Sequence, residues 1–434
     1  MRSDSFCLRR CAIAALLAAL ICGLRPAAGG EALRGVEPAV SAIAARIDAR
    51  GSETRLLFEL TAPVKAETFA AAGPRIIVDL PQVGFRLDPA IGRDAKALLA
   101  ASVAESGVKP GAGTPLIASF RFGLFAPGRS RVVIDLARPA KVLRAESVER
   151  PEGARLEIDL APQDANAFAE AVVAHAAAAQ QAPSASATVV PAAAKEEGEG
   201  TLPLVVVDPG HGGVDIGATG RHGELEKDIV FEFARALKAA IEARGRQRVL
   251  LTRDADVFIP LDGRVRFARQ QGAALFLSIH ADTLGASSVT GATVYTVAAK
   301  ATDAESARIA TKENLADQAA GVEQKAEAEE VGDILFDLAR RETRALGREF
   351  AAGLVAKWRE TASLNKNPSR AASFVVLKAH DVPSALLELG YLSSEKDLAN
   401  LTSPEWRARA AAGVRDAIDA YFLERERPAH AATQ

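Results

Sequence analysis

LPLVVVDPGHGG, at residues 202–213, joins an apolar run to a glycine-rich turn in the second half of this 434-residue chain. The run is typical of a buried strand, and the glycines allow the backbone to turn sharply after it. Strands and helices then alternate. We expect further strands at 249–252, 274–279, 292–297, 373–377 and 385–390, and helices at 226–244, 262–271, 331–359 and 405–422. This alternation predicts an α/β domain over residues 203–425, with a mostly parallel sheet flanked by helices.

Four acid and imidazole groups fall where these strands end or a helix begins, namely His211, Glu226, His280 and Glu388. Ligands of open α/β sheets bind beyond the carboxyl ends of the strands, so we expect the four groups to meet at one edge. Two histidines and a carboxylate can hold one Zn²⁺ with a coordination position left open, and a further glutamate can move protons. The pattern therefore predicts an α/β catalytic domain of the zinc hydrolase type. His222 is a rival ligand because it lies four residues before Glu226, and His211 alone could simply bond backbone groups.

A short apolar pattern recurs earlier in the chain. It reads RLLFEL at 55–60, RIIVDL at 75–80, RVVIDL at 131–136 and RLEIDL at 155–160. Turn-forming Gly and Pro residues bound each copy, as is typical of strands. The repetition indicates a duplicated half, and we expect an all-β sandwich domain over residues 36–160.

Residues 161–200 separate the two folded regions. They are rich in Ala, Ser, Pro and Gln and lack a sustained apolar period. Such a segment cannot bury enough surface to offset the entropy of ordering it, so we expect a flexible linker. Its alanines permit a solvated helix near 166–181, and His175 would then have no rigid frame.

The first residues have the composition of an export signal. A basic stretch with Arg9 and Arg10 precedes an apolar run at 11–24 that is too short to span a bilayer. We expect residues 1–29 to be a signal peptide, cleaved after export by the Sec or the twin-arginine route, which leaves no stable membrane span. The alternative is an uncleaved anchor. All three cysteines lie in this segment, so the mature chain has no disulfide. Its removal takes away four Arg and one Asp and changes the net charge from −2 to −5, which excludes a uniformly basic surface for nucleic acid.

Several motifs together resemble the zinc-dependent type 3 family of N-acetylmuramoyl-L-alanine amidases. They are DPGHGG, EKD fifteen residues after its histidine, TRD, SIHAD and LELGYLS. The resemblance implies that His211, Glu226 and His280 hold one Zn²⁺. It also implies that Glu388 is the catalytic acid and base, and that Arg264 has a structural or substrate-orienting role.

Residues 299–330 form an insertion that a minimal amidase does not require. By resemblance to division amidases, a helix here lies over the active site, and Glu313 matches a glutamate that reaches the zinc. Asp282 matches an additional ligand of that closed form. A carboxylate on the open position would block the site, so the enzyme would be autoinhibited and need an activator, which the resemblance gives as a LytM-domain protein or a divisome regulator. The alternative is a solvated glutamate on a surface helix.

The N-terminal region, residues 36–160, resembles the AMIN domain, which localises periplasmic proteins to the cell wall at division sites. The expected function is cleavage of peptidoglycan between N-acetylmuramic acid and L-alanine in the periplasm, enriched at the division site. There it would serve cell-wall remodelling and daughter-cell separation. Two alternatives stay open: a zinc peptidase or deacetylase acting elsewhere on peptidoglycan, and a wall-binding scaffold with an inactive amidase domain.

Overall fold

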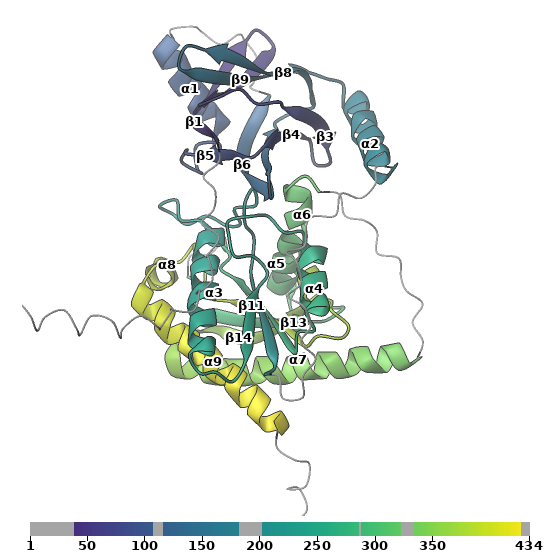
Figure 1. Ribbon diagram of the computed structural model, residues 1–434, viewed down its shortest axis with the longest axis vertical. Coiled ribbons are helices and arrows are strands. Elements are labelled where there is room, and N and C mark those ends of the chain that lie inside the picture. The colour runs from purple at the N-terminus through teal and green to yellow at the C-terminus, as the bar shows by residue number, and fades with distance from the viewer. Residues whose placement is uncertain (1–38, 107–115, 182–201, 286–287, 323–333, 427–434) are drawn as a thin grey trace, which may run out of the picture. The chain divides into compact units, whose positions relative to one another are not determined.

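The computed structural model describes residues 39–106, 116–181, 202–285, 288–322 and 334–426 (Figure 1). The expected signal peptide, residues 1–29, lies outside these ranges. So do the second half of the expected linker and residues 323–333, which include the end of the expected insertion.

The N-terminal domain contains two antiparallel-rich sheets. The first has the order β5-β1-β2-β9-β8 and is formed by β1 (Val40–Arg50), β2 (Glu53–Leu60), β5 (Val83–Phe85), β8 (Ala140–Arg150) and β9 (Gly153–Pro162). The second has the order β3-β4-β7-β6 and is formed by β3 (Glu67–Ala71), β4 (Arg75–Pro81), β6 (Ile117–Ala126) and β7 (Arg129–Leu136). The four recurring segments are β2, β4, β7 and β9. They pair β2 with β9 and β4 with β7, which confirms them as strands.

Both sheets contribute to one apolar core, as expected for a sandwich. Phe58 of the first sheet and Phe120 of the second meet edge to face, with ring centroids 5.7 Å apart. The domain is not all-β, however. Helix α1 (Ala95–Ser106) places Leu99 in the same core. The expectation of a purely β domain is corrected in this respect.

The first half of the expected linker is also structured. Helix α2 (Ala165–Gln181) buries Phe168 in the sandwich core, and His175 stacks on Phe69 with ring centroids 3.8 Å apart. A solvated helix was therefore the wrong expectation for this segment. Two apolar residues one helical turn apart, Phe168 and Val172, pack against the core, and the surrounding alanines hide that short stripe in the sequence.

The C-terminal domain is built on one six-stranded sheet of order β11-β10-β12-β15-β13-β14. Its strands are β10 (Leu204–Pro209), β11 (Arg248–Leu251), β12 (Leu275–His280), β13 (Ala292–Val297), β14 (Leu364–Ala372) and β15 (Ser384–Glu388). Strands β11, β10, β12 and β15 are parallel, as expected. Strand β13 runs antiparallel to β15, and β14 is parallel to β13, so the sheet is mixed.

Helices cover the sheet (Figure 1), and alternate side chains of the sheet pack into two separate cores. Val205 and Val207 face the core formed with α3 (Glu226–Glu242), α7 (Ile334–Thr361) and α9 (Pro404–Glu426). Val206 faces the core formed with α4 (Leu261–Gln270) and α5 (Ala304–Asn314). Burial on both faces explains why β10 begins with the continuous apolar run at 204–207. In the described ranges, no helix combines the length and apolar character needed to cross a bilayer.

The strand expected at 373–377 is wrong. Strand β14 ends at Ala372, and a 3₁₀ turn, η1 (Val375–Leu377), follows. Phe374, Val376 and Leu377 are apolar because they fill a core, without pairing in a sheet. Two short helices were not anticipated, α6 (Ala316–Ala319) and α8 (Glu395–Leu401).

Candidate metal centre and catalytic site

The four predicted groups meet at one edge of the sheet, as expected. His211 lies in the loop after β10, His280 is the last residue of β12, and its register partner on β15 is Glu388. Glu226 opens α3. Its Oε1 atom lies 3.1 Å from His211 Nε2 and 3.2 Å from His280 Nδ1. All four side chains are buried.

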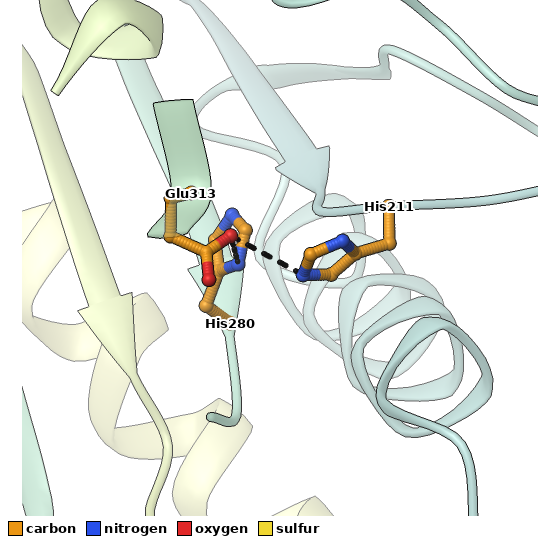
Figure 2. Close-up of side chains that lie close together, drawn as sticks. All are labelled: His211, His280 and Glu313. Atoms are coloured by element: carbon orange, nitrogen blue, oxygen red, sulfur yellow. Dashed lines mark ion pairs between the residues drawn. The ribbon is translucent and has the colours of Figure 1, made fainter. Parts of the chain in front are cut away.

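Glu313 reaches the same point from α5 (Figure 2). Its Oε2 atom lies 3.4 Å from His211 Nε2 and 3.3 Å from His280 Nδ1. Asp303 caps the helix, and Ile309, one turn before Glu313, is fully buried and fixes the face that α5 turns inward. Glu313 is only 4% exposed, so a solvated surface glutamate is the wrong description of this conformation.

The residues fit a bound cation. Among the described residues, four buried side-chain atoms without a hydrogen-bond partner belong to this site: His211 Nε2, Asp282 Oδ2, Glu313 Oε1 and Glu388 Oε1. Buried polar atoms are costly unless they are satisfied. Three potential ligand atoms, one each from His211, His280 and Glu313, all lie within 4.8 Å of one another. Imidazole nitrogens and carboxylate oxygens are donors that suit Zn²⁺.

Glu226 is held by two backbone donors. Its Oε1 accepts from the Ala281 amide at 2.9 Å, and its Oε2 accepts from the Ala218 amide at 2.7 Å. Burial raises the pKa of Glu226, but His211 and His280 outweigh burial and bring this pKa well below its usual value. The carboxylate is therefore ionised and ready to bind a cation.

Glu388 has the opposite electrostatics. Burial raises its pKa well above the usual value, and the carboxylates of Asp282, Glu226 and Glu313 raise it further. Its Oε2 accepts from the Asp282 amide at 3.1 Å, which orients the group. A carboxyl group whose pKa is raised by its surroundings can accept and release a proton, which are the properties of a general base and acid.

His211 is oriented by a residue that the sequence did not reveal. Asp215 Oδ2 lies 2.8 Å from His211 Nδ1, so Nε2 is left toward Glu226 and Glu313. Burial lowers the pKa of His211, but the carboxylates of Asp215, Glu226 and Glu313 outweigh it, and the pKa lies well above the usual value. The one feature of the sequence that could have indicated this contact is the spacing, since Asp215 lies four residues after His211.

Arg264 holds the loop that carries His211. Its guanidinium donates to the His211 carbonyl at 2.8 Å, to the Pro209 carbonyl at 3.0 Å and to Asp208 Oδ1 at 2.8 Å. These contacts favour the structural role over substrate orientation. Asp208 also accepts from the hydroxyls of Thr252 and Ser278. The sequence did not single out Asp208, which looked like one polar residue at the end of a strand.

The remaining candidates differ in position. His222, the rival ligand, is exposed, whereas His211, Glu226 and His280 are buried. Asp282 is fully buried beside the site, and its Oδ1 pairs with the ammonium of Lys312. Lys312 was also missed, because a lysine in a polar helix reads as a solvated residue.

Fold and site together define the class of this protein, an α/β domain with a candidate metal centre at the carboxyl edge of its sheet. A family model described as N-acetylmuramoyl-L-alanine amidase matches residues 205–420. Two relatives named N-acetylmuramoyl-L-alanine amidase AmiC, from Escherichia coli and Neisseria meningitidis, are each 31% identical. Those alignments cover 88% and 87% of this chain and 89% of each relative. A solved structure, the amidase AmiC2 of Nostoc punctiforme, is 27% identical over 51% of this chain and 97% of its own, with a TM-score of 0.37.

The chain belongs to the type 3 family of N-acetylmuramoyl-L-alanine amidases, which hydrolyse a linear amide bond. This confirms the family that the motifs indicated.

Proposed function

We propose that this enzyme cleaves the bond between N-acetylmuramic acid and L-alanine in peptidoglycan by a zinc-dependent reaction. The observation that carries the proposal is the meeting of His211 Nε2 and His280 Nδ1 within 3.2 Å of one carboxylate oxygen of Glu226, beside Glu388. That donor set would hold one Zn²⁺ and leave a coordination position open. When bound, the ion supplies a Lewis acid that polarises a carbonyl and lowers the pKa of water.

Glu388 moves the proton in this proposal. Ionised, it takes a proton from the attacking water, and it then gives that proton to the leaving nitrogen of L-alanine. Its Oε1 has no hydrogen-bond partner among the described residues, while its Oε2 is fixed by the Asp282 amide. One oxygen is thus held in place and the other is available to the reacting groups.

Glu313 makes the conformation described above an inhibited one. Its carboxylate lies against both histidines, where it would fill the open coordination position and exclude water and substrate. Asp282 would be a further ligand of this closed form, through its unpartnered Oδ2. An activator of the LytM-domain type, or a divisome regulator, would have to bind the open state better than the closed one.

The N-terminal domain would act as an AMIN-type targeting module over residues 36–160. The similarity to the AmiC relatives extends over 88% and 87% of the chain and therefore includes this domain. With residues 1–29 as an export signal for the Sec or twin-arginine route, the enzyme would work in the periplasm on cell wall at the division site. Its role there would be wall remodelling and separation of daughter cells.

The test is release of soluble stem peptides from purified peptidoglycan by the mature protein and its Glu313→Ala variant, with and without a chelator. We expect chelator-sensitive release of peptides that begin with L-alanine and carry a free amino group. New termini elsewhere in the stem peptide would indicate a peptidase, and released acetate a deacetylase. Binding to the wall without cleavage by either protein would indicate a scaffold.

A further inference from the structure

Lys312, the residue before Glu313, turns into the candidate site. Its Nζ forms an ion pair with Asp282 Oδ1 and lies 3.7 Å from Glu313 Oε1. Asp282 is fully buried, and the Lys312 side chain is 39% exposed. Arg308, one turn earlier on α5, is exposed to solvent instead. Helix α5 therefore carries two cations: Lys312 points to the site, and Arg308 points to solvent.

The charges around Lys312 explain why it turns inward. Three buried carboxylates gather here, those of Glu226, Asp282 and Glu313. The Lys312 ammonium pairs with Asp282 and lies 3.7 Å from Glu313 Oε1, so it faces two of them directly. A buried carboxylate without a partner cation is strongly unfavourable. Lys312 is such a partner for Asp282.

We propose that Lys312 is a second latch of the closed state, which pairs with Asp282 and holds α5 over the site together with Glu313. This inference rests on the proposed amidase function and extends its gate. Lys312 offsets the negative charge that Glu313 brings into the site from the same helix. Asp282 can serve both the latch and the ion, because Oδ1 meets the lysine while Oδ2 is unpartnered.

Lys312 also affects the free-energy difference between the closed and open states. Glu313 and Lys312 are adjacent on α5 and carry opposite charges, so both leave the site when the helix lifts. The net charge of the site is then the same in the open and closed states. Without Lys312, the closed state would bury Asp282 unpaired, and the equilibrium would move toward the open state.

The experiment compares full-length mature protein carrying Lys312→Met, Lys312→Gln, Lys312→Arg, Arg308→Met or Glu313→Ala. Arg308→Met is the matched control, because it removes an exposed cation from the same helix. Two quantities are measured: stem-peptide release without activator, and hydrogen exchange of the amides of residues 304–314 with zinc and after its removal. The exchange measurement does not require an active enzyme, because the Lys312–Asp282 pair does not use the ion.

We expect Lys312→Met and Lys312→Gln to raise basal release about fivefold, the change that corresponds to an ion pair of about 1 kcal/mol. Exchange in α5 should be faster in both variants, with and without zinc. Lys312→Arg and Arg308→Met should match the wild type in both measurements. Circular dichroism identifies any variant that fails to fold, and the other neutral variant then carries the test.

Two outcomes separate the latch from the function on which it rests. Wild-type exchange and release in the neutral Lys312 variants would overturn the latch, even if Glu313→Ala is activated and the gate stands. Absence of chelator-sensitive cleavage by every protein, Glu313→Ala included, would overturn the proposed function. In that case faster exchange in the metal-free Lys312 variants would still support the ion pair as the contact that holds α5.

Discussion

His211 adopts a backbone conformation that residues other than glycine rarely take, with φ of 58°. The left-handed region costs about 1 kcal/mol for such a residue, so surrounding contacts must hold it. Arg264 binds the His211 carbonyl, and Asp215 binds the ring. Gly212 and Gly213 also have positive φ and let the chain turn away directly after the histidine. These contacts fix the position of the proposed ligand through its own loop.

Asp215 should matter for metal affinity. Asp215→Asn removes the charge that orients and polarises His211, and we expect zinc affinity to fall about 10- to 100-fold, as for other partners of ligating histidines. Competition with a chromogenic chelator measures the change. Asp254→Asn, at an exposed position, is the control and should bind zinc like the wild type. Equal affinity of both variants would show that Asp215 has no part in holding the ligand.

Glu388 should matter for turnover and not for metal binding. Glu388→Ala removes the proposed acid and base, and we expect stem-peptide release to fall about 10²- to 10⁴-fold. Zinc content, measured by atomic absorption on the same preparation, should stay at one ion per chain. If the variant also loses its zinc, Glu388 is a ligand and the proton-transfer role is wrong.

At the scale of elements, α5 carries Glu313 into the site and would close it in the proposed gate. Glu313→Ala removes the carboxylate that lies between the two histidines, so we expect basal release to rise on the order of tenfold, which corresponds to about 1.4 kcal/mol. Thr311→Ala, exposed on the same helix, is the control. Unchanged or lower activity of Glu313→Ala would contradict the gate.

Helix α6 is tied to α4 by a buried carboxylate. Asp317 Oδ1 accepts from the Leu261 amide at 2.9 Å, and burial raises the pKa of Asp317 from 3.8 to about 6. Asp262 raises it too, whereas the Leu261 amide and Arg264 lower it. The folded protein therefore binds this proton more tightly than the unfolded chain. The contribution of Asp317 to the free energy of unfolding should fall as pH rises from about 4 to about 6, by at most about 3 kcal/mol.

Asp317→Asn tests whether this contribution falls as pH rises, because the Asn side-chain oxygen can accept the same hydrogen bond and does not titrate. We expect the stability of the variant relative to the wild type to increase from pH 4 to pH 6 and to stay constant above pH 7. Urea unfolding midpoints at four pH values measure it. Parallel curves for the two proteins would show that Asp317 titrates alike in the folded and unfolded states.

Over the whole molecule, the sequence was informative where a local pattern and a topological rule coincide. His280 and Glu388 could be brought together because parallel strands end at a common edge. The sequence did not predict that β13 runs antiparallel to β15, because the segments on either side of β13 do not indicate its direction in the sheet. Asp208 and Lys312 were missed for a related reason. Their roles depend on partners 56 and 30 residues away, Arg264 and Asp282, and a single sequence carries no record of such pairs.

Metal removal should affect the stability of the whole protein. Zn²⁺ would bind the folded site and not the unfolded chain, so it adds about 4 kcal/mol of stability when its free concentration is about a thousandfold above Kd. We expect a chelator to lower the unfolding temperature of the mature wild-type protein by several degrees in calorimetry. In His211→Ala, which lacks one ligand, the chelator should cause a much smaller shift. A shift of equal size in both proteins would mean that the ion stabilises the chain somewhere other than at His211, Glu226 and His280.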